Sequence, residues 1–517
     1  MDLFLTRHAS EVKGTLSGFD RVRFRGTLRW LANLPGMGVW LSHAGVLLKD
    51  FGEYAMGLTN RIKEATRELA EKAGRPVIYL HSSSLRKEDF ARDIAEREGI
   101  AEGLVCVLSA VEPCHTFTVG PNREAKKLEL RSHQGKCLHQ YFYLIDPQLG
   151  WLNVRLQTWL PFTVHVVING REWLSQQLFR KGLAFERRDN CFIDIADVRR
   201  AQRIMDRQLA SDWPRLLDRL LRRVHPAHRT LFGRERLDYY WSADETEWAS
   251  DVMFRSPADL SALYPRLVRH AMLSFGGGDV LRFLGKRPCV QQFRNAEILS
   301  HLGARCEGVR VKHAWDRNSL KMYDKQQSVL RVETTINNTR QMKVFRTPQN
   351  DPDGPQSWQK LRKGVADLAR RAEISQKSNE RYLDALSAVE AEPTLAETAA
   401  QVCRRARWNG RPVRALNPLA DQDARLLEAV SRGEFLLQGF RNRDLRGILF
   451  GEAKSADTRR REMAKATRLI RMLRAHGLVH KVAKTHRYTV SNHGREIITA
   501  LLAARSANAH KLMQIAA

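Results

Sequence analysis

The chain has 517 residues and a large excess of positive charge, with 86 lysines and arginines against 57 aspartates and glutamates, a formal net charge of +29 and a pI near 10.2. This balance excludes an ordinary metabolic enzyme and favours a polyanionic partner. The length predicts roughly three to four domains of about 150 residues each. The hydrophobic content of 43% is enough for several cores, so we expect a folded chain.

Neither a membrane segment nor a cysteine framework is indicated by the sequence pattern. There is no run of about 18 apolar residues, and the first residues lack the apolar segment of a signal peptide. We therefore expect a cytoplasmic, nucleoid-associated protein without a membrane partner. The seven cysteines are scattered and never form a Cys-x-x-Cys pair, so we expect neither a disulfide framework nor a zinc knuckle.

Residues 1–130 have the alternation of an α/β domain. Helical periodicity runs from 45 to 74 and ends at a glycine, which commonly closes a helix. A strand-like segment at 76–80, a second helix at 83–99 and an apolar strand at 103–111 follow. Because a strand, a helix and a strand in succession form a βαβ unit, we expect the two strands to be parallel.

Residues 131–346 are predicted to form an α+β domain with long β-hairpins. Two aromatic-rich segments flank the turn at 147–150 and predict the first hairpin. An amphipathic helix follows, and then arginine-rich helices that are bent or broken at Pro214. The fold class expected for the whole chain is therefore α/β (α+β) and multidomain.

Three acidic residues between 239 and 254 are candidates for metal binding. We interpret this segment as a helix, in which Glu247 and Asp251 lie four residues apart on one face, with Asp244 upstream. Two-metal nucleases and transposases use carboxylates of this kind. The alternative is that the acids interact with the dipole at the start of the helix.

Residues 319–345 are the most informative segment of the chain. Apolar residues alternate up to Met322, pause at a polar turn at 324–327 and resume at Val329, as expected of two strands joined by a tight turn. Four residues share one parity along these strands or lie next to the turn, so they are predicted to meet on one face. They are the candidate catalytic residues Tyr323, Lys325, Arg331 and Glu333.

This face would carry the groups that phosphodiester cleavage requires. A tyrosine hydroxyl, with an ordinary pKa near 10, attacks a phosphate only when a base or a metal activates it. Asp324 or Glu333 is expected to bind Mg²⁺ or Mn²⁺, which would polarise the phosphate. Lys325 or Arg331 would then neutralise the developing charge. The alternative is a set of cross-strand ion pairs on a solvated hairpin.

The tripeptide Tyr-Asp-Lys at 323–325 and the tetrapeptide Leu-Arg-Val-Glu at 330–333 resemble a pattern of the rolling-circle replication initiators of plasmids and filamentous phages. The resemblance implies that Tyr323 nicks one DNA strand with the help of a metal. The His-hydrophobe-His metal motif of many such initiators is missing, since His165 has no second histidine two residues away. The whole chain also resembles proteins of bacterial mobile elements, which implies a role in replication or transposition.

Residues 347–418 are predicted to be a helical connector and linker, and residues 419–517 a basic domain. The pattern of this domain is three helices, two short β-rich runs and a last helix, at 421–435, 440–451, 455–477, 478–491 and 492–506. This order is similar to the winged helix-turn-helix of MarR-type bacterial DNA-binding proteins, with the two β-rich runs as the wing.

The third helix of this basic domain is predicted to contact DNA. Its inner face is formed or flanked by Ala464, Thr467, Leu469, Ile470 and Leu473. Residues 404–517 hold 24 lysines and arginines against 9 aspartates and glutamates. A solvated basic face that binds nothing is the alternative. The candidate nucleic-acid-binding residues of the helix and the wing are Arg459, Arg460, Arg461, Lys465, Arg468, Arg471, Lys484, His486 and Arg487.

Three functions are consistent with these patterns. The first is a mobile-element protein that binds a DNA site and nicks a strand. The second is a non-enzymatic winged-helix transcriptional regulator, and the third is a binding partner of a structured RNA. Convergence of Tyr323, Glu333 and the acids between 244 and 251 would favour the first, because a regulator has no reason to gather them.

Overall fold

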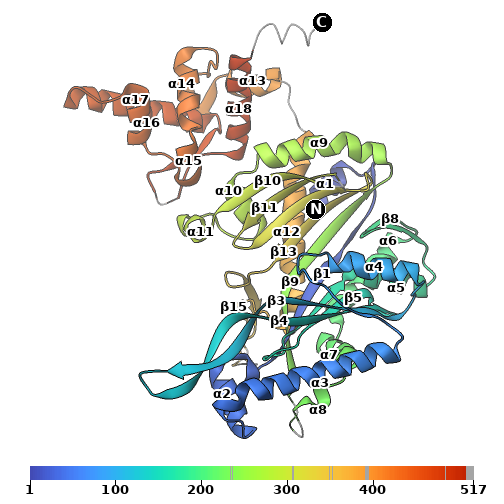
Figure 1. Ribbon diagram of the computed structural model, residues 1–517. Helices are drawn as coiled ribbons and strands as arrows, with labels where there is room; N and C mark the ends of the chain where they lie inside the picture. Colours follow the sequence, from blue (N-terminus) through green and yellow to red (C-terminus); the bar gives the residue numbers. More distant parts are fainter. Residues whose placement is uncertain are drawn as a thin grey trace.

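The computed structural model describes residues 1–507 apart from 233–234, 236, 306–307, 349, 352, 391–394 and 484. Its main body is built on one sheet of eleven strands (Figure 1). In spatial order they are β10 (Ile298–Arg305), β11 (Gly308–Trp315), β12 (Asn318–Lys325), β13 (Val329–Ile336), β9 (Tyr239–Phe254), β1 (Val12–Leu28), β6 (Val164–Asn169), β5 (Gly150–Gln157), β4 (Lys127–Asp146), β3 (Gly103–Asn122) and β2 (Val77–Tyr79).

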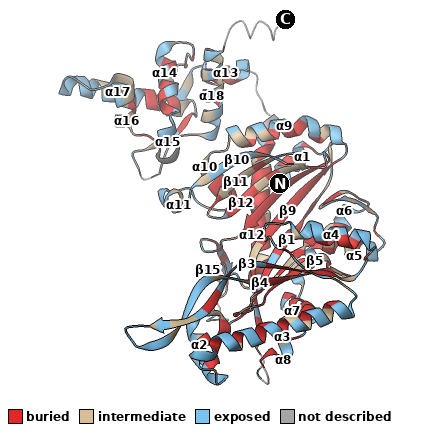
Figure 2. Ribbon diagram, viewed as in Figure 1, coloured by how far each residue is buried: buried red, intermediate tan, exposed pale blue. Residues whose placement is uncertain are grey.

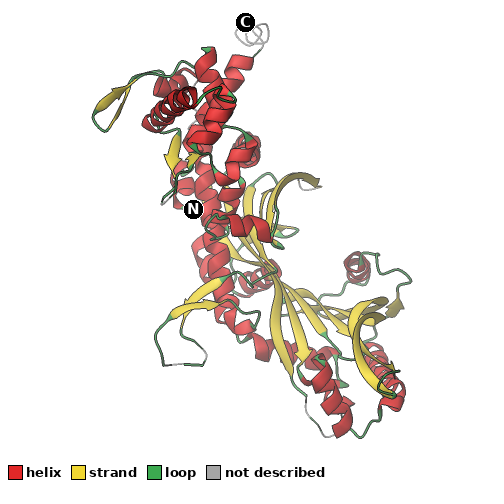
Figure 3. Cartoon of the chain, turned by 90° about the vertical axis from the view of Figure 1, so that its left-hand side faces the viewer, coloured by secondary structure: helices red, strands yellow, loops and turns green. Residues whose placement is uncertain are grey.

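Neighbouring strands of this sheet are antiparallel, except β2 and β3, which are parallel. The helix α4 (Lys87–Arg97) joins β2 to β3, so the predicted βαβ unit is confirmed. Figure 3 shows the long strands twisting strongly along the body. Such a twist is the normal consequence of pairing long strands of L-amino acids.

Helices pack on both sides of the sheet and at its ends. The α-helices of this body are α1 (Asp2–Arg7), α2 (Leu34–His43), α3 (Phe51–Lys72), α5 (Gly170–Arg180), α6 (Val198–Met205), α7 (Trp213–Val224), α8 (His228–Leu231), α9 (Pro257–Leu273), α10 (Gly277–Phe283), α11 (Val290–Asn295) and α12 (Leu368–Leu386). The 3₁₀ turns are η1 (Trp30–Ala32), η2 (Leu48–Asp50), η3 (Asp206–Ala210), η4 (Val365–Asp367) and η5 (Ser387–Glu390).

The segment 239–254 is the strand β9, so its interpretation as a helix was wrong. Residues four apart, such as Glu247 and Asp251, share one face of a strand as well as one face of a helix, so their spacing does not distinguish the two. The aromatic residues at its start and its pairing with two neighbouring strands favour the extended form.

The central position of β9 depends on residues far away in the chain. It pairs with β1 from Leu28↔Tyr239 to Val12↔Phe254, and on its other side with β13. The predicted boundary at residue 130 lies inside β4, and strands from both predicted domains belong to the same sheet.

The hairpin predicted between 319 and 336 is confirmed as β12 and β13. Its turn residues Gln326 and Gln327 both have φ of 57°. Positive φ at both central positions is the backbone of a turn that matches the twist of antiparallel strands, and Ser328 is a third residue between the paired Lys325 and Val329. Behind this hairpin, Asn379 of α12 accepts a hydrogen bond from the Thr334 hydroxyl at 2.7 Å and donates one to the Trp248 carbonyl at 3.1 Å. The helix α12, which lies within the predicted helical connector, therefore packs against β13 and β9.

Residues 395–506 form a separate unit, called the C-terminal unit below, with its own apolar core. Its helices are α13 (Leu395–Val402), α14 (Asp421–Val430), α15 (Gly433–Gln438), α16 (Asn442–Phe450), α17 (Ala456–Ala475) and α18 (Asn492–Ser506). Its two small hairpins are β16 (Ala406–Trp408) with β17 (Arg411–Val413), and β18 (Val479–Lys481) with β19 (Tyr488–Val490). The order of helices, hairpin and last helix from α14 to α18 agrees with the predicted pattern, except that the first predicted helix, 421–435, is two helices, α14 and α15.

The core of the C-terminal unit runs from Val402 to Leu501 and includes Leu416, which lies in the predicted linker. Figure 2 shows this buried interior as distinct from the interior of the main body. Two further hairpins lie on the main body: β7 (Phe185–Arg188) with β8 (Cys191–Ile195), and β14 (Lys343–Arg346) with β15 (Ser357–Lys360).

Candidate functional site

Four adjacent strands, β12, β13, β9 and β1, bring charged side chains to one face of the large sheet. Lys321 pairs with Glu333, and Tyr323 pairs with Arg331, which in turn pairs with Asp251. Because side chains alternate along a strand, these paired positions all lie on the same face. The predicted grouping of Tyr323, Lys325, Arg331 and Glu333 is therefore confirmed as a shared face.

A β-bulge in β1 adds an acid to this face. Phe19 pairs with Trp248 and Arg21 pairs with Glu247, so Asp20 is an extra residue without a partner position on β9. Phe19 packs against Trp248 on the opposite face, with ring centroids 4.9 Å apart. The bulge turns the consecutive residues Asp20 and Arg21 to the same side, which a regular strand cannot do.

Asp20, Glu247 and Glu333 form a buried cluster of three carboxylates. One oxygen from each lies within 4.8 Å of the other two. Carboxylate oxygens are the ligands that Mg²⁺ and Mn²⁺ prefer, so the donor set suits such an ion. However, the Lys321 ammonium lies 2.6 Å from Glu333 Oε1 and 3.0 Å from Glu247 Oε1. It supplies the charge that a metal would bring, and it would have to move aside for one.

The ammonium of Lys321 pairs with both Glu247 and Glu333 and affects the pKa of each carboxyl group. Burial raises the pKa of Glu333 to about 7, and the nearby Glu247 and Asp20 add to this rise against the attraction of Lys321. Burial acts in the same direction on Glu247, but Lys321 and Arg21 outweigh it and hold the pKa of that carboxyl below its ordinary value. Two carboxylates that share one ammonium cannot both ionise easily.

Glu333 is expected to give the stability of the protein a pH dependence. Its ordinary pKa is 4.5, whereas in the folded protein the pKa is about 7. Between these pH values the folded state keeps a proton that the unfolded state loses, so the free energy of unfolding falls as the pH rises through the window. Urea denaturation at several pH values should show this slope in the parent protein and a flatter one in Glu333→Gln. The same slope in both proteins would contradict this expected pH dependence. The control variant is Glu64→Gln, because Glu64 is exposed.

Arg331, predicted to be catalytic, instead takes part in a buried ion-pair network. Its guanidinium donates hydrogen bonds to both Asp251 oxygens at 2.7 and 2.9 Å, to Asp20 at 3.0 Å and to the Asn190 carbonyl at 2.7 Å. Arg171, also buried, lies 3.0 Å from Asp251. Asp251 is therefore held by two arginines, which hold its pKa below the ordinary value although burial opposes this.

Tyr323 lies beside the carboxylate cluster and is half-buried. Burial, and next the charge of Glu333, raise the pKa of its hydroxyl to about 12. The Lys325 ammonium lies over its ring, 5.4 Å from the centroid. The phenol therefore remains protonated at neutral pH unless a base or a metal activates it.

The remaining predicted metal ligands lie elsewhere. Asp324 pairs with Leu330 and so faces the opposite side of the sheet from Tyr323, and burial raises its pKa. Asp244 lies at the other end of β9, 3.5 Å from Arg25 and 3.8 Å from Lys363. Of the five predicted ligands, Glu247 and Glu333 are brought together. The structure adds Asp20, which in the sequence is the one acid of a strand that also carries Lys13, Arg21, Arg23 and Arg25.

The second candidate site is the basic face of α17. Its inner residues Leu469, Ile470 and Leu473 are buried as predicted, whereas Ala464 and Thr467 are exposed. Six cations on the helix are exposed: Arg459, Arg460, Arg461, Lys465, Arg468 and Arg471. In the wing, His486 is exposed and Arg487 donates a hydrogen bond to the Gly439 carbonyl at 3.3 Å. Lys484 lies outside the described residues.

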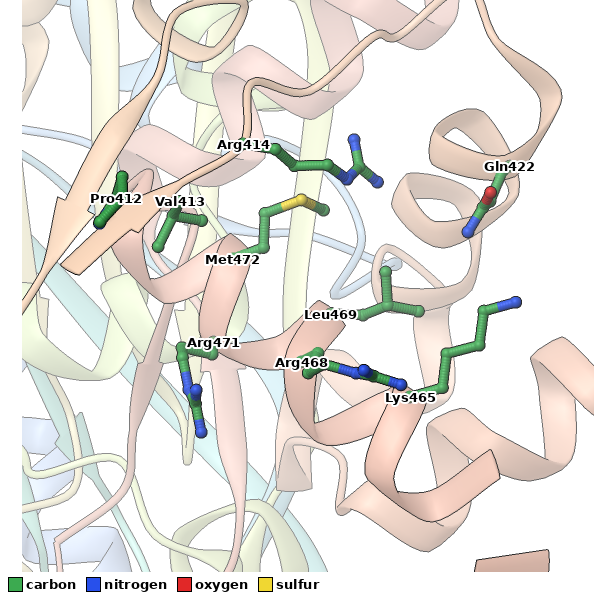
Figure 4. A pocket seen from close by; sticks show the side chains of 9 residues that line it. All are labelled: Pro412, Val413, Arg414, Gln422, Lys465, Arg468, Leu469, Arg471 and Met472. Carbon is green, nitrogen blue, oxygen red and sulfur yellow. The ribbon is translucent and has the colours of Figure 1, made fainter. Parts of the chain in front are cut away.

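A pocket of about 400 Å³ lies between α17, α14 and the β16–β17 hairpin. Figure 4 shows Lys465 and Arg468 of α17 at its edge, with Arg414 on the opposite side. The Arg414 guanidinium donates a hydrogen bond to Asp423 Oδ2 at 2.7 Å. The Lys465 ammonium lies over the Phe450 ring, 5.2 Å from the centroid, in a cation–π arrangement, and the side chain is exposed.

Comparisons of the chain with protein families, with curated proteins and with solved structures gave no match. Among the residues that the structure describes, none of the helices is both long enough and apolar enough to cross a membrane.

Proposed function

We propose that this protein binds duplex DNA through its C-terminal unit, with α17 against the DNA. The observation that carries the proposal is the first half of α17. No residue from Ala456 to Lys465 is buried, although this segment is two to three helical turns long. Helices in proteins are normally stabilised by packing of one face, so this half has the surface of a helix that packs on a partner.

The charge of α17 supports a nucleic acid as that partner. Within the described part of the chain, no ion pair involves the six exposed cations of the helix, while Glu462 pairs with Arg446 at 2.9 Å. Their charge is thus available to phosphates, which supply most of the affinity in DNA binding. A helix followed by a two-stranded hairpin is also the arrangement of a winged helix, whose recognition helix enters the major groove.

The test is the double variant Arg468→Ala/Arg471→Ala in the full-length protein. Loss of the two cations should weaken duplex binding by about 1 to 3 kcal/mol for each residue that contacts a guanine. It should also reduce the slope of log affinity against log salt by about one unit for each residue that contacts a phosphate. Fluorescence anisotropy with a labelled duplex, from low to moderate salt, measures both quantities.

A control for total charge is available on α3. Arg67→Ala/Lys72→Ala removes the same charge from exposed positions of the main body and should leave affinity and slope nearly unchanged. Equal losses in both double variants would show that only net charge matters, and no loss in either would contradict the proposal. Preference for a structured RNA over duplex DNA would support the third function instead.

Cleavage of a DNA strand at the large sheet is a second candidate function. It is favoured by the carboxylate oxygens of Asp20, Glu247 and Glu333, which lie within 4.8 Å of one another. These carboxylates are on the face of the sheet that carries Tyr323. In this reaction the phenol would lose its proton and its oxygen would form a bond to phosphorus. The bond between phosphorus and the sugar oxygen would break, and that oxygen would take up a proton to become a hydroxyl. A Mg²⁺ or Mn²⁺ ion held by the three carboxylates would polarise the phosphate. The protein would then be an initiator of replication or a transposase-like enzyme of a mobile element.

A further inference from the structure

The β14–β15 hairpin carries an exposed aromatic pair. Phe345 and Trp358 are paired directly across its two strands, and their ring centroids lie 5.6 Å apart in an edge-to-face arrangement. Their exposed fractions are 55% and 66%, unusually high for such large apolar side chains. Val344, on the opposite face, packs with Met342 and Leu361 in a small core, so the hairpin does not need the aromatic pair for its own packing.

Two lysines flank the aromatic pair on the same face. Lys343 lies two residues before Phe345 and Lys360 two residues after Trp358, and the two lysines are themselves directly paired. Like charges opposite each other destabilise a strand pair. A strand pair with two lysines directly opposite each other becomes more favourable when an anion binds to both of them.

A pocket of about 300 Å³ lies beside the hairpin and is lined by residues from both of its faces. The aromatic pair forms one side of it, and α12 and the loop after α10 form the others. Five of its lining residues are cations, against one acid, Glu373. The cations are Lys286, Lys343, Arg370, Lys377 and Arg381.

We infer that this face binds single-stranded nucleic acid. Aromatic side chains stack on bases of any sequence, and lysines beside them neutralise the backbone phosphates. In a duplex the faces of the bases are covered by their neighbours, so exposed Phe345 and Trp358 can stack only on unpaired bases. This site is distinct from the duplex-binding surface proposed for α17, and it requires neither that surface nor strand cleavage.

The experiment measures binding of a labelled oligothymidine of about 12 nucleotides to the full-length protein by fluorescence anisotropy. Trp358→Ala should weaken binding by about fivefold to about 150-fold, the loss expected for one base that stacks on an aromatic ring. Phe345→Ala should have an effect of the same order, and Trp358→Phe should retain most of the affinity. Lys343→Ala/Lys360→Ala should weaken binding and lower its salt dependence.

Phe179→Ala is the matched control, since Phe179 is 79% exposed on α5, away from the hairpin. It should not change oligothymidine binding, and Arg468→Ala/Arg471→Ala should reduce duplex binding more than oligothymidine binding. Unchanged affinity in both Trp358→Ala and Phe345→Ala would overturn the inference. Loss of self-association in Trp358→Ala, with oligothymidine binding intact, would also overturn it and identify the pair as a contact between protein copies.

Discussion

Replacing Arg331 by methionine is expected to lower the free energy of unfolding by about 3 to 5 kcal/mol. The guanidinium of Arg331 is 1% exposed and holds two buried carboxylates, Asp20 and Asp251, in hydrogen-bonding distance. Methionine fills similar space but leaves one or both carboxylates without their partner in a medium where an isolated charge is costly. Chemical denaturation of the purified variant measures the change directly.

An exposed arginine provides the comparison. Arg188 pairs with Glu186 at 2.9 Å, and both side chains are more than half exposed. Surface pairs of this kind contribute at most about 1 kcal/mol, so Arg188→Met should change stability little. A loss of less than about 1 kcal/mol in Arg331→Met would show that the network is not what holds the centre of the sheet together.

Replacing Tyr323 by phenylalanine is expected to abolish strand cleavage, with a loss of about 1,000-fold or more, if the second candidate function is correct. The change removes one oxygen from a half-buried ring, so the fold and DNA affinity should stay nearly intact. Incubation with Mg²⁺ or Mn²⁺ and labelled single-stranded and duplex DNA would reveal nicked product, and denaturing electrophoresis would reveal a covalent adduct. Glu333→Gln should lose activity as well, through weaker metal binding.

Tyr79→Phe is the control for this experiment, because Tyr79 is 60% exposed on the edge strand β2. It should cleave like the parent protein. An adduct or nicked product in Tyr323→Phe at the parent rate would eliminate the tyrosine mechanism. A parent protein that binds duplex DNA and never nicks it would leave the carboxylate cluster as a structural ion-pair network and favour the non-enzymatic regulator.

The β12–β13 hairpin was predictable because its pattern is local. Alternation of apolar residues and a polar turn between Met322 and Val329 define both strands and the face that Tyr323 and Glu333 share. The order of elements from α14 to α18 was predictable for the same reason, since caps, periodicity and β-rich runs lie within short segments.

The rest of the candidate site depends on pairing between distant segments. Asp20 joins Glu247 and Glu333 only because β1 pairs with β9, more than 200 residues away, and because a bulge turns it to the charged face. Neither event leaves a signal in the sequence around residue 20. The parity of Arg331 was predicted correctly, but its ion-pair network was not, because its partners Asp20 and Asp251 lie on two other strands.

The place of β1 at the centre of the sheet also constrains how the chain reaches its native state. The β9 partner of this strand is synthesised more than 200 residues after it, and the β13 hairpin later still. Contacts of such long sequence separation form slowly, and the apolar side of β1 stays without its final neighbours during synthesis. We therefore expect the C-terminal unit, whose contacts are local, to refold fast, and the main body to refold slowly and to benefit from chaperones.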